Sequence, residues 1–161
     1  DGLMMGTRSG AIDPGVLLYL QQHGMSLNEL ECVLYQESGL LGVSGLSADM
    51  RVLLASDDPR AAEALELLTF HVAREVAAMT NTLGGLECLV FTGGIGEHSA
   101  EVRQKICERL RWLGVRIDGS TPDQSSEQIS TENRLVEIRV IPTSEETMIA
   151  RHCSEMLQAR P

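Results

Sequence analysis

The sequence has few aromatic residues, only 3% of its 161 residues, and none of its cysteines forms a CxxC pair. The absence of such pairs argues against a zinc site. The four cysteines are Cys32, Cys88, Cys107 and Cys153. We interpret them as buried free thiols in a reducing compartment, and expect a cytoplasmic protein. The hydrophobic fraction is 43% and mostly aliphatic, which suffices for one core of the kind found in helix-rich and α/β proteins.

Basic clusters and long apolar runs are also lacking. There are 13 basic and 23 acidic residues, for a net charge of −10, and neither sign forms a block. Nonspecific nucleic-acid binding requires clustered Lys and Arg, so nucleic acid is not an expected partner, although a nucleotide site needs only local donors. No run approaches the roughly 20 apolar residues of a membrane span, and no signal peptide opens the chain. The chain begins without Met and enters a motif-like segment at once, so we expect a fragment.

Capping residues and periodicity predict several helices. In the first half these lie at 14–23, from Ser26 to near Gly39, at 49–54 and at 59–82. Pro14 suits a first turn, Ser26 and Glu29 form a capping box, and Asp58 precedes a proline. The last of these helices should be central and largely buried, because its apolar residues step by three and four. That stripe is Leu65, Leu68, Val72, Val76, Met79 and Leu83, widened by Phe70, Ala73 and Ala77. Residues 39–45 are expected to form a glycine-rich connection.

The second half alternates strands and helices, which predicts an α/β layer with ligands at the carboxyl ends of the strands. The apolar run at 86–91 fits a strand covered on both faces. A tight turn at 92–96 and a helix at 100–112 capped by Ser99 follow it. The remaining expected elements are a short strand at 115–117, an exposed polar loop at 119–128, a strand at 135–141 and a helix from Glu145 to about 159.

The segment from Phe91 to Ser99 is the strongest site candidate. A buried strand leads into a glycine turn, and the turn leads into a helix. Glycines allow positive φ and close approach of a ligand to backbone amides, and a helix start favours phosphate. No Lys-Ser or Lys-Thr follows the glycines and the spacing is not GxGxxG, so neither motif applies. Taken alone, an ordinary strand-to-helix connection explains the segment equally well.

Three further segments carry charged residues in suitable places. Arg8 lies between flexible residues and could bind a carboxylate or phosphate in bidentate fashion. Asp49 could bond a ribose hydroxyl, with Arg51 against a base or phosphate. Glu145 follows a strand and could hold Mg²⁺ through water. Taken singly, each has a simpler interpretation: a solvated turn arginine, a helix cap with a surface ion pair, and acidic charge at a helix start.

Together the four segments resemble the acetate kinase family in order and spacing. The matching stretches are MGTRSGAIDPG (5–15), ESGLLGVSGLSADMR (37–51), LVFTGGIGEHSAEVR (89–103) and VIPTSEETMIAR (140–151). The resemblance runs almost end to end. It implies an α/β fold of the actin-like, sugar-kinase-type (ribonuclease H-like) ATPase class, with a mixed sheet flanked by helices. It also implies that residues 1–161 are the C-terminal nucleotide-binding domain of a two-domain enzyme whose N-terminal domain is absent.

The resemblance assigns roles to individual residues. It implies that Arg8 is catalytic and that Glu145 binds Mg²⁺ or Mn²⁺. The nucleotide-binding residues that it implies are Asp49, Met50, Arg51, Gly94, Ile95, Gly96, Glu97 and His98. Two positions depart from the family pattern: Ala11 stands where the family usually has an acid, and His98 where it usually has Asn. The histidine keeps a polar group, so nucleotide binding is expected to survive.

The reaction that the resemblance implies is phosphoryl transfer from ATP to acetate, giving ADP and acetyl phosphate. Such chemistry depends on positioning and charge neutralisation. A homodimer formed through this chain is also implied. The isolated chain should not catalyse this reaction, because the family's acetate-binding residues lie in the first domain. A propionate or butyrate kinase of the same family, or a non-catalytic module for nucleotide binding or dimerisation, are the alternatives.

Overall fold

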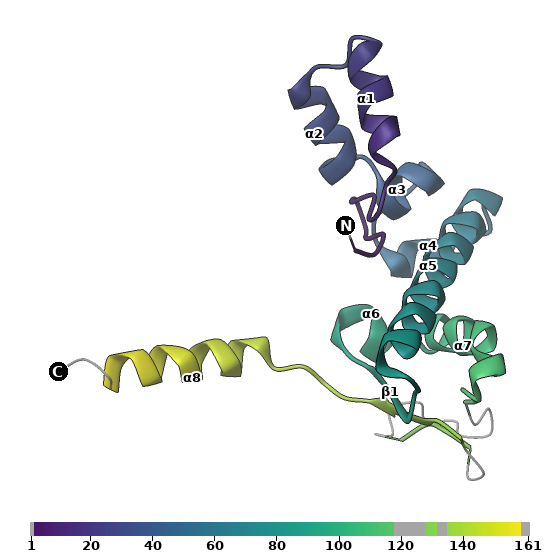
Figure 1. Cartoon of the computed structure of the whole chain (residues 1–161), viewed down its shortest axis with the longest axis vertical. Helices are drawn as coiled ribbons and strands as arrows, with labels where there is room; N and C mark the ends of the chain where they lie inside the picture. The colour runs from purple at the N-terminus through teal and green to yellow at the C-terminus, as the bar shows by residue number, and fades with distance from the viewer. Residues whose placement is uncertain (1, 118–127, 132–134, 159–161) are drawn as a thin grey trace.

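The computed structural model describes residues 2–117, 128–131 and 135–158 of the chain. A helical hairpin lies at one end, the long helix α5 crosses the middle, and a small sheet with two helices lies at the other end (Figure 1). The elements are α1 (Pro14–Gln22), α2 (Leu27–Gln36), α3 (Gly39–Ser44), α4 (Met50–Leu54), α5 (Pro59–Leu83), β1 (Cys88–Phe91), α6 (Gly93–His98), α7 (Ala100–Arg109), a 3₁₀ turn (Arg111–Leu113), β2 (Glu137–Val140) and α8 (Glu145–Gln158).

The capping signals correctly place the starts of the first two helices. Asp13 accepts a hydrogen bond from the Gly15 amide at 2.6 Å, with Pro14 in the first turn of α1. At α2, the Ser26 amide donates to the Glu29 carboxylate at 2.7 Å, and the Glu29 amide donates to the Ser26 hydroxyl at 3.3 Å. The predicted capping box is therefore confirmed, because each residue satisfies an amide that the helix leaves open.

Residues 39–44 form helix α3, so the predicted glycine-rich connection is wrong. Tertiary contacts outweigh the low helix propensity of glycine here. Leu40 is fully buried, Ser44 donates to the Leu40 carbonyl at 2.7 Å, and α3 packs against α5. Gly39 has φ 64° and lies against the backbone of the N-terminal loop, where any side chain would collide with the Met5 carbonyl.

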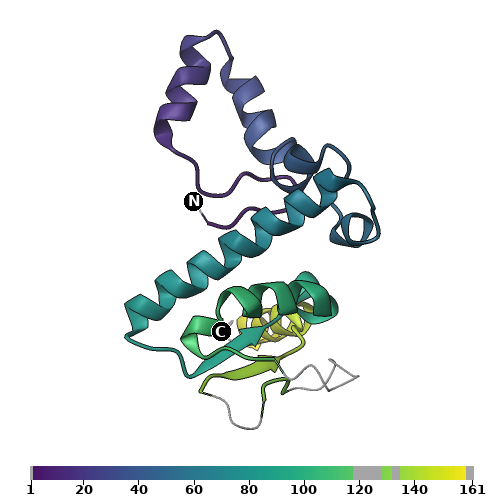
Figure 2. The same ribbon diagram turned by 90° about the vertical axis from the view of Figure 1, so that its right-hand side faces the viewer.

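Helix α5 is central, as predicted, but only its first half is largely buried. It lies between the helical hairpin on one side and the layer of α7 and the strands on the other (Figure 2). Leu65 and Leu68 are buried, whereas Phe70, Met79 and Leu83 are exposed, so the prediction fails toward the end of the helix. The physical reason is that α3, α4 and α7, the helices that pack most extensively against α5, do not cover its whole stripe. Gly84 ends the helix in the left-handed conformation.

The described sheet consists of β1 and β2, which pair in parallel from Cys88 opposite Glu137 to Phe91 opposite Val140. Among the described residues, antiparallel pairing is confined to two isolated bridges, Ile117 with Ser130 and Gln128 with Arg139. The predicted strand at 115–117 is therefore reduced to one bridge. The predicted coverage of β1 on both faces is also wrong.

Strand β1 alternates in burial along its length. Phe91 is buried and Leu89 half-buried, whereas Cys88 and Val90 are exposed. A strand is buried on both faces only when layers cover both, and the described elements cover one. Cys107 in α7 is the one described cysteine that is buried, so the interpretation of all four as buried thiols holds for Cys107 alone. Most of the predicted polar loop, residues 118–127, lies outside the described residues.

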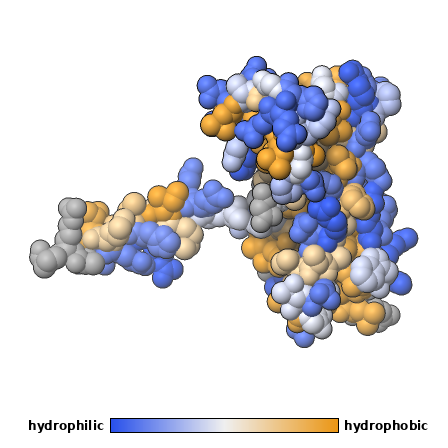
Figure 3. All heavy atoms as spheres, turned by 45° about the horizontal axis from the view of Figure 1, so that its top comes forward, coloured by the Kyte–Doolittle hydropathy of each residue, from blue (hydrophilic) through white to orange (hydrophobic). Residues whose placement is uncertain are grey.

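Helix α8 agrees with its prediction and projects away from the rest of the molecule (Figure 1). Every residue of α8 is exposed. Hydrophobic residues gather along one side of the helix (Figure 3), and the large ones are Met148, Ile149, Met156 and Leu157. No helix among the described residues has the length and apolar character needed to cross a membrane.

Candidate nucleotide site

A cavity of about 570 Å³ lies between the start of α4 and helix α6. Residues from two of the predicted segments line it together. The lining residues are Ala48, Asp49, Met50, Arg51, Leu54, Gly94, Ile95, His98 and Ser99. Six of the eight predicted nucleotide-binding residues are therefore brought to one place, although the two segments are far apart in the sequence. Gly96 and Glu97 are the two that do not line this cavity.

Helix α6 occupies the segment predicted as a tight turn, and that prediction is wrong. Gly93 begins the helix with φ 73°, a conformation that favours glycine. The Gly93 amide donates to the Glu97 carboxylate at 2.7 Å, and this side-chain contact closes one turn of the chain. Apart from its chain neighbours and the backbone of α6 itself, a Cβ atom on Gly94 would meet no atom within 4 Å. The backbone at Gly94 is thus open to close approach from the cavity.

The Glu97 side chain makes hydrogen bonds to other parts of the protein. Its Oε1 accepts hydrogen bonds from the Gly93 amide, from the Thr143 amide at 2.9 Å and from the Thr143 hydroxyl at 3.0 Å. These bonds lower the pKa of Glu97, the bond from the Thr143 amide most of all. The carboxylate therefore ties α6 to the segment that follows β2, and this connection was not predicted from the sequence.

Asp49 caps α4 and is paired with a neighbouring arginine. It accepts from the Arg51 amide at 2.9 Å and from the Arg51 guanidinium at 3.1 and 2.6 Å. The arginine contacts lower the pKa of Asp49 to about 2. Asp58 and Arg60 form the same arrangement at the start of α5, with the pKa of Asp58 likewise lowered to about 2. The cap and ion pair are thus real, and at Asp49 they also border the cavity.

The loop that carries Arg8 lies against the α4 side of the site. A Cβ on Gly6 would lie 3.1 Å from the Ala48 carbonyl oxygen, so the two backbones are nearly in contact. The same loop contacts the start of α3, where the Leu40 amide donates to the Met5 carbonyl at 3.0 Å. The Arg8 side chain is exposed and makes no hydrogen bond or ion pair with the described residues. Its guanidinium is therefore available to a ligand.

Glu145 begins α8, two residues beyond Thr143, and its side chain is exposed. The described residues contain no group of three or more His, Cys, Asp or Glu side chains placed to hold a metal ion. A magnesium ion bound here would therefore take oxygens from a phosphate and from water besides a carboxylate. Magnesium sites in nucleotide-dependent enzymes commonly have this composition.

Arg103 contacts helix α6 beside the site, and sequence reasoning missed it. It lies on α7 with only 2% of its surface exposed, and its Nη1 donates to the carbonyl oxygens of Gly96 and Glu97, each at 2.8 Å. Burial lowers the pKa of its guanidinium. The sequence signal is an arginine on the helix that directly follows the glycine segment, at the last position of the stretch 89–103 that resembles the family.

Comparison with known proteins assigns the family. A sequence profile of the acetokinase family matches residues 1–151. The chain belongs to the acetokinase family. Among curated relatives, the acetate kinase of Rhodopseudomonas palustris is 54% identical over 158 residues, and that of Rickettsia felis is 45% identical over 158 residues. These matches cover 94% and 98% of the chain, but 39% and 41% of the relatives.

Solved structures of acetokinases resemble the chain closely. A propionate kinase from Francisella tularensis superposes with a TM-score of 0.86 and 42% identity, over 93% of this chain and 40% of that one. The acetate kinase of Porphyromonas gingivalis gives a TM-score of 0.87 and 35% identity, over 98% of this chain and 41% of that one. The chain thus spans about two fifths of the length of these family members and shares their fold over that length.

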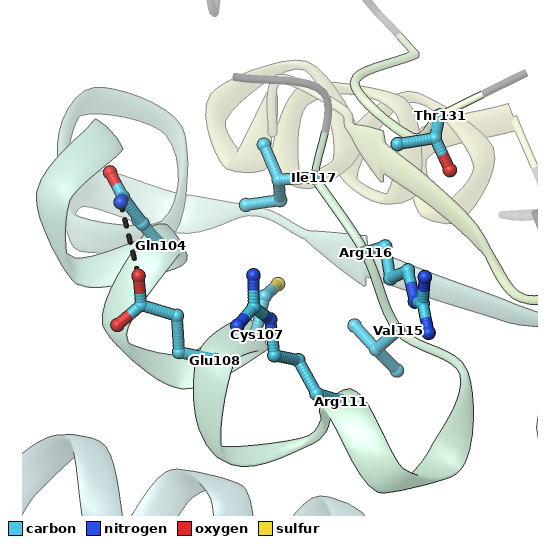
Figure 4. Close-up of a pocket in the computed structure, with 8 residues that line it drawn as sticks. All are labelled: Gln104, Cys107, Glu108, Arg111, Val115, Arg116, Ile117 and Thr131. Carbon is cyan, nitrogen blue, oxygen red and sulfur yellow. Dashed lines mark hydrogen bonds between the residues drawn. The ribbon is translucent and has the colours of Figure 1, made fainter.

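A second cavity, of about 680 Å³, contains none of the residues that the family resemblance singled out. It lies beside α7, and Arg111, Arg116 and Thr131 are among the side chains around it (Figure 4). The buried Cys107 also lines it, and burial raises the pKa of that thiol to about 12. A thiol with this pKa stays protonated at neutral pH, so Cys107 does not supply a nucleophile to the cavity.

Proposed function

We propose that this chain supplies the nucleotide and magnesium half of the active site of an acetate kinase. The enzyme would transfer the γ-phosphoryl group of ATP to acetate, giving ADP and acetyl phosphate, and would also catalyse the reverse reaction. The observation that carries the proposal is the cavity between α4 and α6, which unites residues 48–51 with Gly94, Ile95 and His98. Membership of the acetokinase family supports the reaction.

The cavity suits the adenosine part of ATP. Met50, Leu54 and Ile95 offer apolar surface for a base, while Asp49 and His98 offer polar groups at its border. Nucleotide pockets commonly combine apolar walls with a few placed polar groups. Gly94 lacks a side chain where the ligand would approach, so backbone and nucleotide can come close. Gly96 and Glu97 would contribute by shaping α6.

Arg8 and Glu145 would act on the phosphates. The Arg8 guanidinium, which pairs with no described residue, suits a bidentate contact with the transferring phosphoryl group or with the acetate carboxylate. Glu145 would hold Mg²⁺ (or Mn²⁺) together with phosphate oxygens and water, and the bound ion would neutralise phosphate charge. In such chemistry the protein contributes mainly alignment and charge stabilisation, so these residues need only the right positions.

The remaining properties of the whole enzyme follow from the same proposal. The domain would be of the actin-like, ribonuclease H-like class, in a cytoplasmic homodimer joined through this chain. Leu18, Tyr19, Leu27 and Tyr35 on the α1–α2 hairpin are exposed, as are the apolar side chains of α8, and such surfaces favour protein contacts. Light scattering of the full gene product should give twice the monomer mass. A monomer at micromolar concentration would exclude the dimer.

Acetyl phosphate formation tests the function directly. The full gene product, supplied with MgATP and acetate, should form a hydroxylamine-trappable acyl phosphate, whereas the 161-residue chain alone should not. The reading frame upstream of Asp1 provides an independent check, since a continuous frame encoding a further domain supports the enzyme. A start codon adjacent to Asp1 would instead indicate a non-catalytic module. Acyl phosphate formation by the isolated chain at the full rate would refute the half-site assignment.

Propionate is the second candidate substrate, because one structural relative is described as a propionate kinase and is 42% identical to the chain. The two acids differ by one methylene, which a hydrophobic pocket distinguishes by only about 1–3 kcal/mol. Steady-state rates with acetate, propionate and butyrate at equal concentrations decide between them. A kcat/KM for propionate above that for acetate would replace acetate as the assigned substrate.

A further inference from the structure

Helix α6 is too short and too rich in glycine to hold its own shape. It has six residues, three of them glycine, and the side chain of its N-cap residue, Thr92, makes no capping hydrogen bond. Isolated helices below about 12 residues are marginal in water, and each glycine in a helix costs about 1 kcal/mol relative to alanine. The surrounding structure must therefore fix the position of α6.

Two charged side chains fix its two ends. At the carboxyl end, the buried Arg103 guanidinium binds the carbonyl oxygens of Gly96 and Glu97. At the amino end, the Glu97 carboxylate binds the Gly93 amide and reaches Thr143, beyond β2. Neither Arg103 nor Glu97 lines the cavity between α4 and α6. Any effect of these residues on a ligand there must pass through the position of α6.

The burial of Arg103 indicates that its guanidinium is needed for hydrogen bonding and not only for packing. A charged group loses its hydration when it is buried, and it is retained only where hydrogen bonds compensate. An apolar residue would fill the same space at lower cost if packing alone were needed. The guanidinium instead donates hydrogen bonds from one nitrogen to two carbonyl oxygens of the same short helix, each at 2.8 Å. Charge-assisted bonds of this kind are short and strongly directional.

We propose that Arg103 and Glu97 are paired positioning residues, which hold α6 in the orientation that receives the nucleotide. Glu97 also links α6 through Thr143 to the segment of Glu145, so the nucleotide and magnesium parts of the site keep a fixed relation. This inference rests on the proposed ATP site. Under this proposal Glu97 does not contact the nucleotide, as the family resemblance implied it would, but holds α6, whose residues line the cavity, in position.

The test compares Arg103→Met and Glu97→Ala with the parent full gene product. Each should raise the KM for MgATP about ten- to a hundredfold while the KM for acetate stays within twofold, because misplacement of a binding element by about 1 Å has effects of this size. Glu97→Gln keeps an acceptor oxygen and should recover most of the affinity. Arg109→Met is the matched control, because Arg109 lies on the same helix but pairs with Glu66 and lies over Phe70.

The possible outcomes separate the explanations. A merely structural role would lower the melting temperature and the active fraction, so kcat would fall in proportion while the KM for MgATP stayed unchanged. A KM for MgATP within twofold of the parent in both variants would overturn the proposal. Should Arg103→Met fail to fold, Glu97→Ala and Arg103→Lys decide by the same criterion. If the parent binds MgATP and Gly94→Val abolishes binding, the ATP site stands whatever these variants show; if the parent binds none, both proposals fail.

Discussion

Gly94 offers the sharpest test of the ATP site, because a substitution there should change nucleotide affinity without lowering the stability of the fold. A Cβ there would meet nothing within 4 Å, and the backbone of Gly94 is not in the left-handed region. Replacement by alanine thus brings no clash and no strain. Alanine in place of glycine inside a helix stabilises it by up to about 1 kcal/mol. The free energy of unfolding of Gly94→Ala should stay equal or rise slightly.

Nucleotide affinity should change in the opposite direction. The added methyl group enters the cavity where Gly94 faces it, and an extra methyl or methylene in a fitted site costs about 1–3 kcal/mol. Since each 1.4 kcal/mol is a factor of ten, we expect the Kd for MgATP to rise about 5- to 150-fold. Gly94→Val should raise it further. Gly93→Ala differs, because φ of 73° at Gly93 strains any other residue and should lower stability.

Isothermal titration calorimetry of the full gene product with MgATP, together with thermal unfolding, measures both effects. Gly85→Ala is the matched control, since Gly85 also has open space around a Cβ and normal φ but does not line the cavity. It should leave the Kd unchanged. If Gly94→Ala and Gly94→Val both fold and both bind MgATP with the parent affinity, the cavity between α4 and α6 is not the nucleotide site.

Three further predictions follow from the same geometry. Because the pKa of Asp49 and Asp58 falls from an ordinary 3.8 to about 2 on folding, each carboxylate stabilises the fold above its ordinary pKa and loses that effect as pH falls toward 2. Acid titrations of Asp49→Asn and Asp58→Asn should each show a shallower loss of stability over this range, but only Asp49→Asn should weaken MgATP binding, and equal effects on binding would exclude a special role for Asp49. Glu145→Ala should raise the Mg²⁺ concentration needed for half-maximal rate at least about tenfold, because substitution of residues that hold or support a metal commonly lowers metal affinity by this much. An unchanged magnesium dependence would show that Glu145 is not part of the metal site. Cys107, buried and with a pKa of about 12, should resist thiol reagents at pH 8 until the protein is unfolded, and mass spectrometry showing rapid labelling of the native protein would contradict its burial.

Local rules explain why much of the secondary structure could be predicted. The starts of α1, α2 and α5 follow from Pro14, Ser26 and Asp58, because a first-turn proline and a capping side chain both act within a few residues. Gly84 ends α5 for a similarly local reason. The glycine segment also stood out as a site candidate from its position between strand and helix.

Helices α3 and α6 could not be predicted in this way, because glycine propensity opposes both. Contacts with distant parts of the chain decide them: α3 packs on α5, and α6 is held by Arg103 and by the link from Glu97 to Thr143. The exposed face of β1 was missed for a related reason. An apolar run shows that a strand can be buried, whereas the elements around it determine whether it is.

The sequence by itself thus determined the order of the elements, the family resemblance and the segments that could carry chemistry. Only the tertiary structure decided which of those segments meet. It brings Asp49–Arg51 against Gly94, Ile95 and His98, and it turns Glu97 inward to Thr143. Capping and periodicity act over a few residues, so they are visible in the sequence. The contacts that join α4, α6 and the segment after β2 depend on how α5 and the strands pack, and no local pattern records that packing.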